Sequence, residues 1–130
     1  MAAAEIADRY ERYIDACNAR EFDRLGMFVA DDVIASETAT GLDAYVRGLE
    51  DVVAGFPDYH WNIEQLVVED GYIAARLTGT GTHRGEFRQV AATQRTVEVQ
   101  ELAVYRTDAG KIAQCWGDLG AVLRDELLSA

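Results

Sequence analysis

The chain lacks most of the features that identify a function directly. Its 130 residues contain one proline, two cysteines and two histidines. No apolar run approaches the roughly 20 residues of a membrane span, and charge already appears at Glu5 and Asp8, before the apolar segment of a signal peptide could form. These absences predict a soluble, cytoplasmic protein that folds as one domain over residues 1–130.

Basic and metal-binding residues are also scarce. With 23 acidic against 12 basic residues, the net charge of −11 disfavours nucleic acid and anionic membranes, because neither would gain from counterion release. His60, His83, Cys17 and Cys115 follow no zinc or redox spacing. GxGxxG, P-loop and GxSxG motifs are missing as well. We therefore expect no metal, no organic cofactor and two reduced, buried thiols.

What is present is a change of hydrophobic period along the chain. Helical spacing predicts a first helix over 6–17, a short second one over 22–29 and a third that starts at Thr40-x-x-Asp43 and ends near Gly55. A short strand is predicted over 32–38. From residue 59 a period of two predicts strands over 59–68, 71–83, 95–106 and 111–118, followed by a helix over 121–128. This order predicts an α+β fold with helices packed on a curved, mainly antiparallel sheet.

Several stretches resemble the SnoaL-like polyketide cyclases of the nuclear transport factor two-like superfamily. They include "YIDACNAREFDRLGMFVADDV" near the start, "VEVQELAVYR" in the third long strand and "AGKIAQCWGDLGAVLRDEL" at the end. The resemblance covers nearly the whole chain. It implies a cone with an internal cavity, a homodimer formed through the sheet, and ring closure of a small hydrophobic carbonyl compound by an intramolecular aldol reaction without a cofactor.

Asp118 is the first candidate for the chemistry. A strand over 111–118 places Ile112, Gln114, Trp116 and Asp118 on one face. At the mouth of an apolar cavity, desolvation would raise the pKa of a carboxylate toward neutrality. The resemblance implies that Asp118 is the general acid/base of the cyclisation. Because a helix follows, Asp118 is equally well placed to cap it.

His83 is the second candidate. It shares a strand face with Gly79 and Gly81, which leaves room for a ligand or for a packed helix. The resemblance includes this histidine. A neutral imidazole there would polarise a ketone or carry a proton, whereas a structural imidazole would bond to a loop.

A third set of candidates comes from a second resemblance. "RYIDACNARE" and "SETATG" are similar to segments of the ketosteroid isomerases. That resemblance implies that Tyr13 donates a hydrogen bond to an enolate, that Glu37 moves the proton and that Glu101 is a neutral acid beside the oxyanion. The structural alternatives are a core tyrosine at position 13 and solvated carboxylates at 37 and 101.

Aromatic residues supply candidate contacts for a flat hydrophobic molecule. We expect Trp116, Trp61 and Phe56, together with Gln114, to bind the substrate, although aromatic residues at such spacing also build cores. The sequence thus predicts a cofactor-independent acid/base enzyme, foremost a polyketide-type cyclase. A ketosteroid-isomerase-like enzyme and a noncatalytic small-molecule binding protein are the alternatives.

Overall fold

The computed structural model describes residues 1–35 and 40–129. Helical and extended elements alternate only at the beginning, and the long strands follow one another. The elements are α1 (Ala3–Asn18), the 3-10 helix η1 (Phe22–Met27), β1 (Val29–Ile34), α2 (Leu42–Gly55), β2 (His60–Glu69), β3 (Tyr72–Thr82), β4 (Thr96–Asp108), β5 (Lys111–Gly117) and α3 (Leu119–Leu128).

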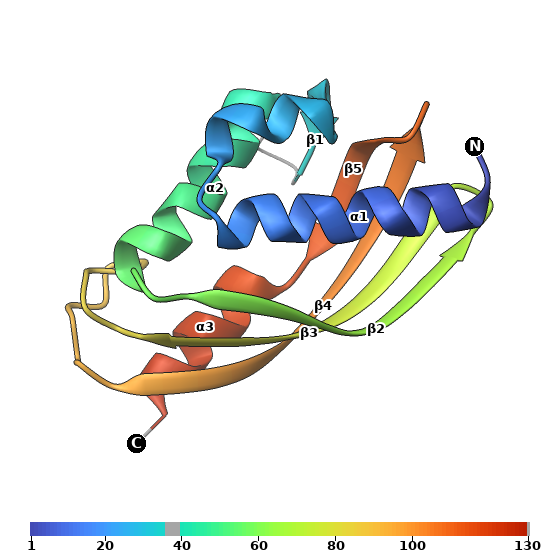
Figure 1. Cartoon of the computed structure of the whole chain (residues 1–130). Coiled ribbons are helices and arrows are strands. Elements are labelled where there is room, and N and C mark those ends of the chain that lie inside the picture. Colours follow the sequence, from blue (N-terminus) through green and yellow to red (C-terminus); the bar gives the residue numbers. More distant parts are fainter. Residues whose placement is uncertain (36–39, 130) are drawn as a thin grey trace.

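One curled sheet organises the chain. Its strand order is β1-β5-β4-β3-β2, in which β2 to β5 pair antiparallel and β1 joins β5 in parallel. The sheet does not close, and α1 lies across its concave side (Figure 1). The predicted α+β fold is confirmed, whereas the single domain over residues 1–130 stays a prediction.

Alternation along β4 separates the core from the outer face. The odd positions are buried: Val97, Val99, Glu101, Ala103 and Tyr105. Leu102 and Val104 between them are exposed by 51% and 42%. The matching stripe of α1 was predicted correctly, because Ile6, Tyr10, Tyr13, Ile14 and Cys17 are all buried. Strand alternation and helix stripe thus meet on the concave side.

Two local predictions near the start of the chain were wrong. Helix α2 begins after Gly41, whose φ of 99° only glycine adopts readily, and among the described residues no side chain caps it. The expected capping box at Thr40 and Asp43 therefore does not form. The segment 22–29 is a 3-10 helix only as far as Met27, and β1 already begins at Val29. The end of the predicted strand, 36–38, lies outside the described residues.

The expected common face of Ile112, Gln114, Trp116 and Asp118 is also wrong, because β5 carries a bulge. Thr107 pairs with Ile112 and Arg106 with Gln114, which leaves Ala113 as an extra residue. Every side chain after Ala113 therefore changes face. Ile112 is buried, whereas Trp116 points outward and is 48% exposed.

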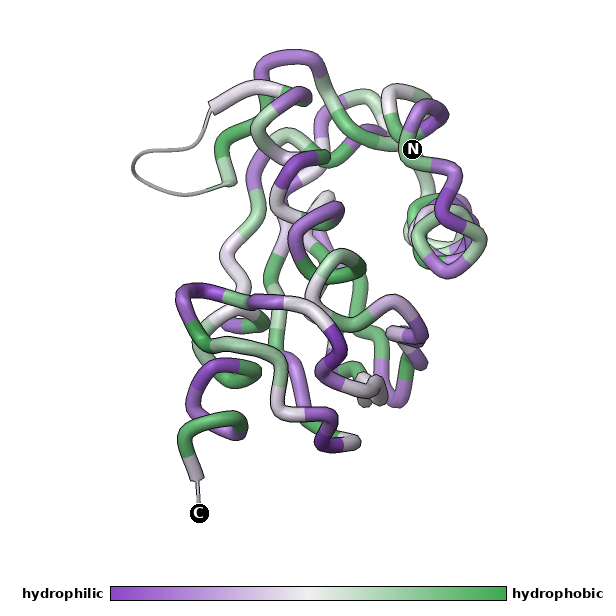
Figure 2. Tube along the Cα trace, turned by 90° about the vertical axis from the view of Figure 1, so that its left-hand side faces the viewer, coloured by the Kyte–Doolittle hydropathy of each residue, from purple (hydrophilic) through white to green (hydrophobic). Residues whose placement is uncertain are grey.

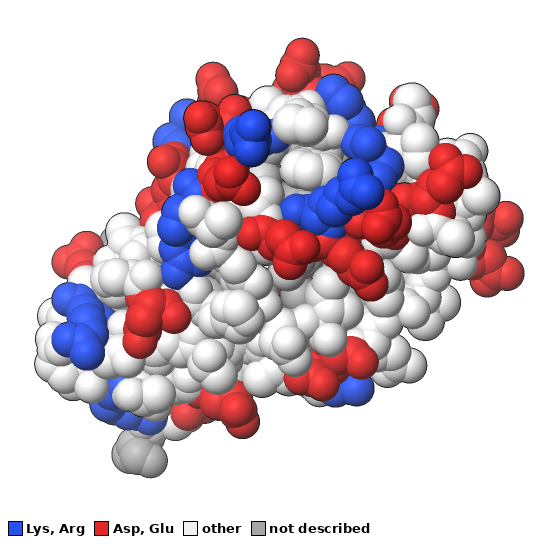
Figure 3. Space-filling view, viewed as in Figure 1, with Lys and Arg blue, Asp and Glu red and all other residues white. Residues whose placement is uncertain are grey.

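Hydrophobic residues are distributed through the whole chain rather than gathered in one segment (Figure 2). Within residues 1–35 and 40–129, no helix is both long and apolar enough to cross a membrane. Acidic and basic groups are interspersed over the face seen in Figure 3. The predicted cytoplasmic location stays a prediction.

Tyr59 packs against the glycines of β3. A Cβ atom at Gly79 would overlap the Tyr59 hydroxyl, and one at Gly81 would lie 3.0 Å from the Tyr59 ring. The face that looks bare in the sequence is therefore filled by a side chain that precedes β2. The Tyr59 hydroxyl is itself buried without a hydrogen-bond partner among the described residues.

The space around each glycine predicts opposite effects for substitutions at Gly79 and Gly48. Gly79→Ala should destabilise the fold by about 1–3 kcal/mol, because the new methyl group displaces Tyr59. Gly48→Ala in α2 should stabilise it by up to about 1 kcal/mol, since a Cβ there meets no atom within 4 Å and alanine favours the helix. Urea denaturation of both variants measures the two shifts. A neutral Gly79→Ala would show that Tyr59 does not rest on this glycine.

Candidate functional site

A pocket of about 630 Å³ opens between α1, α2 and the concave side of the sheet. We define its floor by six lining residues: Tyr13, Cys17, Tyr45, Trp61, Glu101 and Tyr105. We define its mouth by five others: Gly48, Asp51, Glu86, Arg88 and Gly120. Five of the floor residues are buried and uncharged, and the mouth residues other than glycine are exposed and charged.

Glu101 carries the carboxyl group of this floor. It occupies an inward position of β4, opposite Leu77 of β3, and is only 8% exposed. Its Oε1 has no hydrogen-bond partner among the described residues. Burial, with a smaller contribution from the charge of Asp118, raises the pKa of Glu101 to about 7. A side-chain interaction with Trp61 lowers this pKa, but by less. The carboxyl group can therefore both accept and release a proton near neutral pH.

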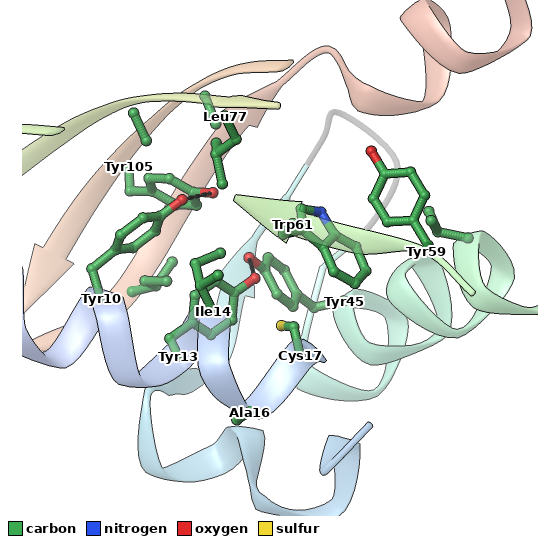
Figure 4. Packing of buried hydrophobic residues seen from close by; sticks show 14 of the residues in the cluster. Tyr10, Tyr13, Ile14, Ala16, Cys17, Tyr45, Tyr59, Trp61, Leu77 and Tyr105 are labelled. Atoms are coloured by element: carbon green, nitrogen blue, oxygen red, sulfur yellow. Dashed lines mark hydrogen bonds between the residues drawn. The ribbon is translucent and has the colours of Figure 1, made fainter. Parts of the chain in front are cut away.

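Two hydrogen-bonded tyrosine pairs connect α1 to α2 and to β4 (Figure 4), and three of these tyrosines, Tyr13, Tyr45 and Tyr105, line the same pocket as Glu101. The hydroxyl oxygens of Tyr13 and Tyr45 are 2.6 Å apart, and those of Tyr10 and Tyr105 are 3.0 Å apart. Burial raises the pKa of all four phenols, so they stay protonated at neutral pH. Within a pair one hydroxyl donates to the other, which leaves one proton available for a further acceptor.

Both cysteines line the pocket and are free. Cys17 from α1 is buried as expected, whereas Cys115 from β5 is half-buried rather than buried. Burial raises the pKa of each to about 12. Since the thiolate is the nucleophilic form, both act as neutral, soft parts of the wall.

Asp118 lies at the end of β5, outside the pocket lining. It is the N-cap residue of α3 by position, but its side chain makes no capping bond. Its Oδ1 instead accepts the backbone N–H of Leu102 at 3.0 Å. The structure therefore assigns Asp118 neither a direct place on the pocket wall nor the expected side-chain cap.

His83 is likewise separated from the pocket lining. Its Nδ1 accepts the backbone N–H of Thr93 at 3.1 Å and lies 3.0 Å from the Thr93 hydroxyl. The ring stacks on Phe56 with centroids 5.2 Å apart. This is the loop-bonded arrangement that the sequence left open as the alternative to a catalytic role.

The structure thus brings together Tyr13, Glu101 and Trp61 out of the predicted site residues. Phe56 is fully buried and does not line the pocket, and neither do Gln114 and Trp116. Glu37 lies outside the described residues.

Tyr45 and Arg88 are among the pocket residues that sequence reasoning missed. Tyr45 carried a signal, since it stands on the apolar stripe of the predicted third helix, where a hydroxyl is unusual. Arg88 carried none, because it lies in a connection without periodicity. Across the described part of the chain, no group of three His, Cys, Asp or Glu side chains is placed to hold a metal ion. The expectation that neither metal nor cofactor is needed stays a prediction.

The family follows from comparison with known proteins. The sequence pattern of the SnoaL-like polyketide cyclases matches residues 7–124. A SnoaL-like polyketide cyclase from Agrobacterium tumefaciens is 30% identical, with a TM-score of 0.83 over 98% of this chain and 99% of that one. The chain therefore belongs to the SnoaL-like polyketide cyclase family, as the sequence predicted.

More distant solved structures share the fold. TsrD from Streptomyces laurentii is 21% identical, with a TM-score of 0.88 over 100% of this chain and 99% of that one. AclR from Streptomyces galilaeus is 22% identical, with a TM-score of 0.81 over 98% of this chain and 100% of that one. No curated protein matches the chain.

The burial of Glu101 predicts a distinctive dependence of stability on pH. Because its folded pKa of about 7 exceeds the ordinary 4.5, the folded chain binds this proton more tightly than the unfolded chain does. The resulting stabilisation is complete below about pH 4.5 and is lost as pH rises through 7.

Relative to Glu101→Gln, the wild-type protein should therefore lose about 3 kcal/mol of unfolding free energy between pH 4.5 and pH 8. Chemical denaturation of both proteins across that range gives the difference directly. A constant difference would mean that Glu101 titrates alike in the folded and unfolded states.

Proposed function

We propose that this chain is an acid/base enzyme that closes a ring in a small hydrophobic carbonyl compound, without a metal or an organic cofactor. The observation that carries the proposal is Glu101, a buried carboxyl group on the wall of a ligand-sized pocket, with one oxygen that has no hydrogen-bond partner in the described part of the chain. Membership of the polyketide cyclase family supports the choice of reaction. Glu101 takes the acid/base role that the sequence assigned to Asp118.

The proposed step moves one proton out and back. The Glu101 carboxylate removes a proton from the carbon beside a substrate carbonyl, and the carbonyl becomes an enolate. A hydroxyl of the Tyr13–Tyr45 pair donates a hydrogen bond to the enolate oxygen. The enolate carbon then attacks a second carbonyl of the same molecule, forming the C–C bond and an alkoxide. Protonated Glu101 returns its proton to that alkoxide, so the product has the composition of the substrate.

An isomerase uses the same first half of this step. The paired hydroxyls of Tyr13 and Tyr45 beside Glu101 are an arrangement that also suits transfer of a proton between two carbons of an enolate. The two reactions differ only in whether a second carbonyl or the returning proton captures the enolate. A noncatalytic binding protein would hold a ketone in the same pocket without forming any enolate.

Enolate formation is measurable without knowledge of the natural substrate. We expect the wild-type protein to catalyse deuterium exchange beside the carbonyl of 2-tetralone in D₂O, followed by NMR. Glu101→Gln should slow the exchange at least about 100-fold, the usual contribution of a general base. No exchange by the wild-type protein would favour the noncatalytic reading.

Asp118→Asn separates the two candidate acids. Because the charge of Asp118 raises the pKa of Glu101, its removal should move the acidic limb of the exchange rate to lower pH while exchange continues. Loss of exchange in Asp118→Asn, with exchange retained in Glu101→Gln, would return the role to Asp118.

Gly48→Phe should abolish exchange by filling the mouth, with Gly48→Ala as its matched control.

We also propose that the protein is a homodimer formed through the outer face of the sheet. Val67, Val104 and Trp116 are exposed by 42–52%. Through Ala74 they form one row across four strands, because Val67 pairs with Ala74, Ala74 with Val104 and Val104 with Trp116. A second copy, which also carries a net charge of −11, is repelled least at such an uncharged row.

The dimer predicts different effects for two exposed apolar side chains. Val104→Lys should convert the dimer to a monomer, since it places two ammonium groups in the shared face. Leu128→Lys, at a side chain of similar exposure on α3, should leave the dimer intact. Sedimentation velocity reports both masses. A monomeric wild-type protein would contradict the proposal.

A further inference from the structure

Arg88 is the cationic side chain of the pocket lining within the described residues. It lies at the mouth, in the connection between β3 and β4. Arg88 and the next residue, Gln89, have φ angles of 45° and 68°, a left-handed backbone that is costly for side chains other than glycine. This conformation fixes the direction in which the Arg88 side chain leaves the loop.

The guanidinium group is held from two sides. It lies over the ring of Phe87, 5.9 Å from the centroid. On the other side it rests against Gly120, where a Cβ atom would overlap it. Because residue 120 is a glycine, the guanidinium group of Arg88 has room at the edge of the pocket.

The surroundings of this cation combine the start of a helix with two carboxylates, Asp51 and Glu86, that do not pair with it. Gly120 belongs to the first turn of α3, whose backbone dipole adds positive potential there. No carboxylate of the described residues forms an ion pair with Arg88. Asp51 and Glu86 line the same mouth, so an anion is favoured only close to the guanidinium group.

We propose that Arg88 selects substrates that carry a carboxylate on the end that remains at the mouth. The inference rests on the proposed function, because it assumes that the carbonyl end of the substrate reaches Glu101. A planar guanidinium binds a carboxylate through two parallel N–H···O bonds, a geometry that a neutral ester or amide does not reproduce. The substrate class is therefore a hydrophobic keto acid, with the reacting carbonyl deep in the pocket and the acid group at its edge.

Other arginines of the chain do not compete for this role. Arg84 lies in the same connection and is exposed, but it does not line the pocket. Arg20 donates to the backbone oxygens of Cys17, Pro57 and Tyr59, and Arg95 donates to the end of α3. Arg84 therefore serves as a matched control, equal in charge and location along the chain.

The test compares 2-naphthylacetic acid with 2-naphthylacetamide, which has nearly the same shape and no charge. Isothermal titration calorimetry at pH 7.5 and low salt should show about tenfold tighter binding of the acid by the wild-type protein. Arg88→Gln should remove this preference by weakening the acid about tenfold and leaving the amide within twofold. Arg84→Gln should keep the preference.

Two further variants locate the effect. Gly120→Ala keeps the arginine and displaces its guanidinium group, so the preference for the acid should fall. Gly48→Phe should abolish binding of both probes, because the phenyl ring fills the mouth. If this variant bound the acid as tightly as the wild-type protein, the acid would bind outside the pocket and the inference would be overturned.

The absence of a preference in the wild-type protein, whether both probes bind equally or neither binds, would also overturn the inference. So would an equal loss of both probes in Arg88→Gln. Neither probe needs to react, and Glu101→Gln should keep the preference for the acid. A failure of selection is therefore distinguishable from a failure of the proposed chemistry.

Discussion

Burying a carboxylate that has neither a partner nor a proton costs free energy, which the rest of the fold must supply. Glu101 lies in this position because it occupies an inward place in β4, between the buried Val99 and Ala103. Turning the acid toward solvent would require a one-residue slip of the strand, which would expose the other inward side chains as well. The alternation that builds the core thus also holds a proton-binding group inside it, at a cost to stability that rises with pH.

The charge of Glu101 has no counter-ion on the pocket floor, because the floor residues among those described include no cation and the tyrosines there stay neutral. The tyrosines bond to one another in pairs, and Arg20, which follows α1, donates to backbone oxygens at the end of α1 and before β2. Arg9 and Lys111 similarly bind backbone oxygens that fix η1 and the turn after β4. Cations therefore stabilise the scaffold, and the pocket floor stays neutral apart from one acid.

The period of the sequence predicted the helices and strands because these depend on local alternation, and the inward position of Glu101 follows from the same pattern. The prediction that Asp118 shares a face with Ile112 was wrong because the bulge at Ala113 reverses the faces of β5. A bulge has no signature in the alternation of polar and apolar residues. His83 was favoured because Gly79 and Gly81 looked empty, but their space is filled by Tyr59, which is about 20 positions away. Packing between distant segments decides whether a strand face is open to a ligand, and the periodic pattern of the sequence does not show that packing.

The division between floor and mouth constrains how any ligand can lie. An anionic group is disfavoured at the floor once Glu101 has lost its proton, whereas a carbonyl oxygen meets the neutral donors of Tyr13 and Tyr45 there. At the mouth the order is reversed, since Arg88 favours an anion and water remains accessible. A molecule with a ketone at one end and an acid at the other therefore gains most in a single orientation. Under the proposed function, that orientation sets the enolisable carbon beside Glu101, so the charges proposed to select the ligand would also align it for proton transfer.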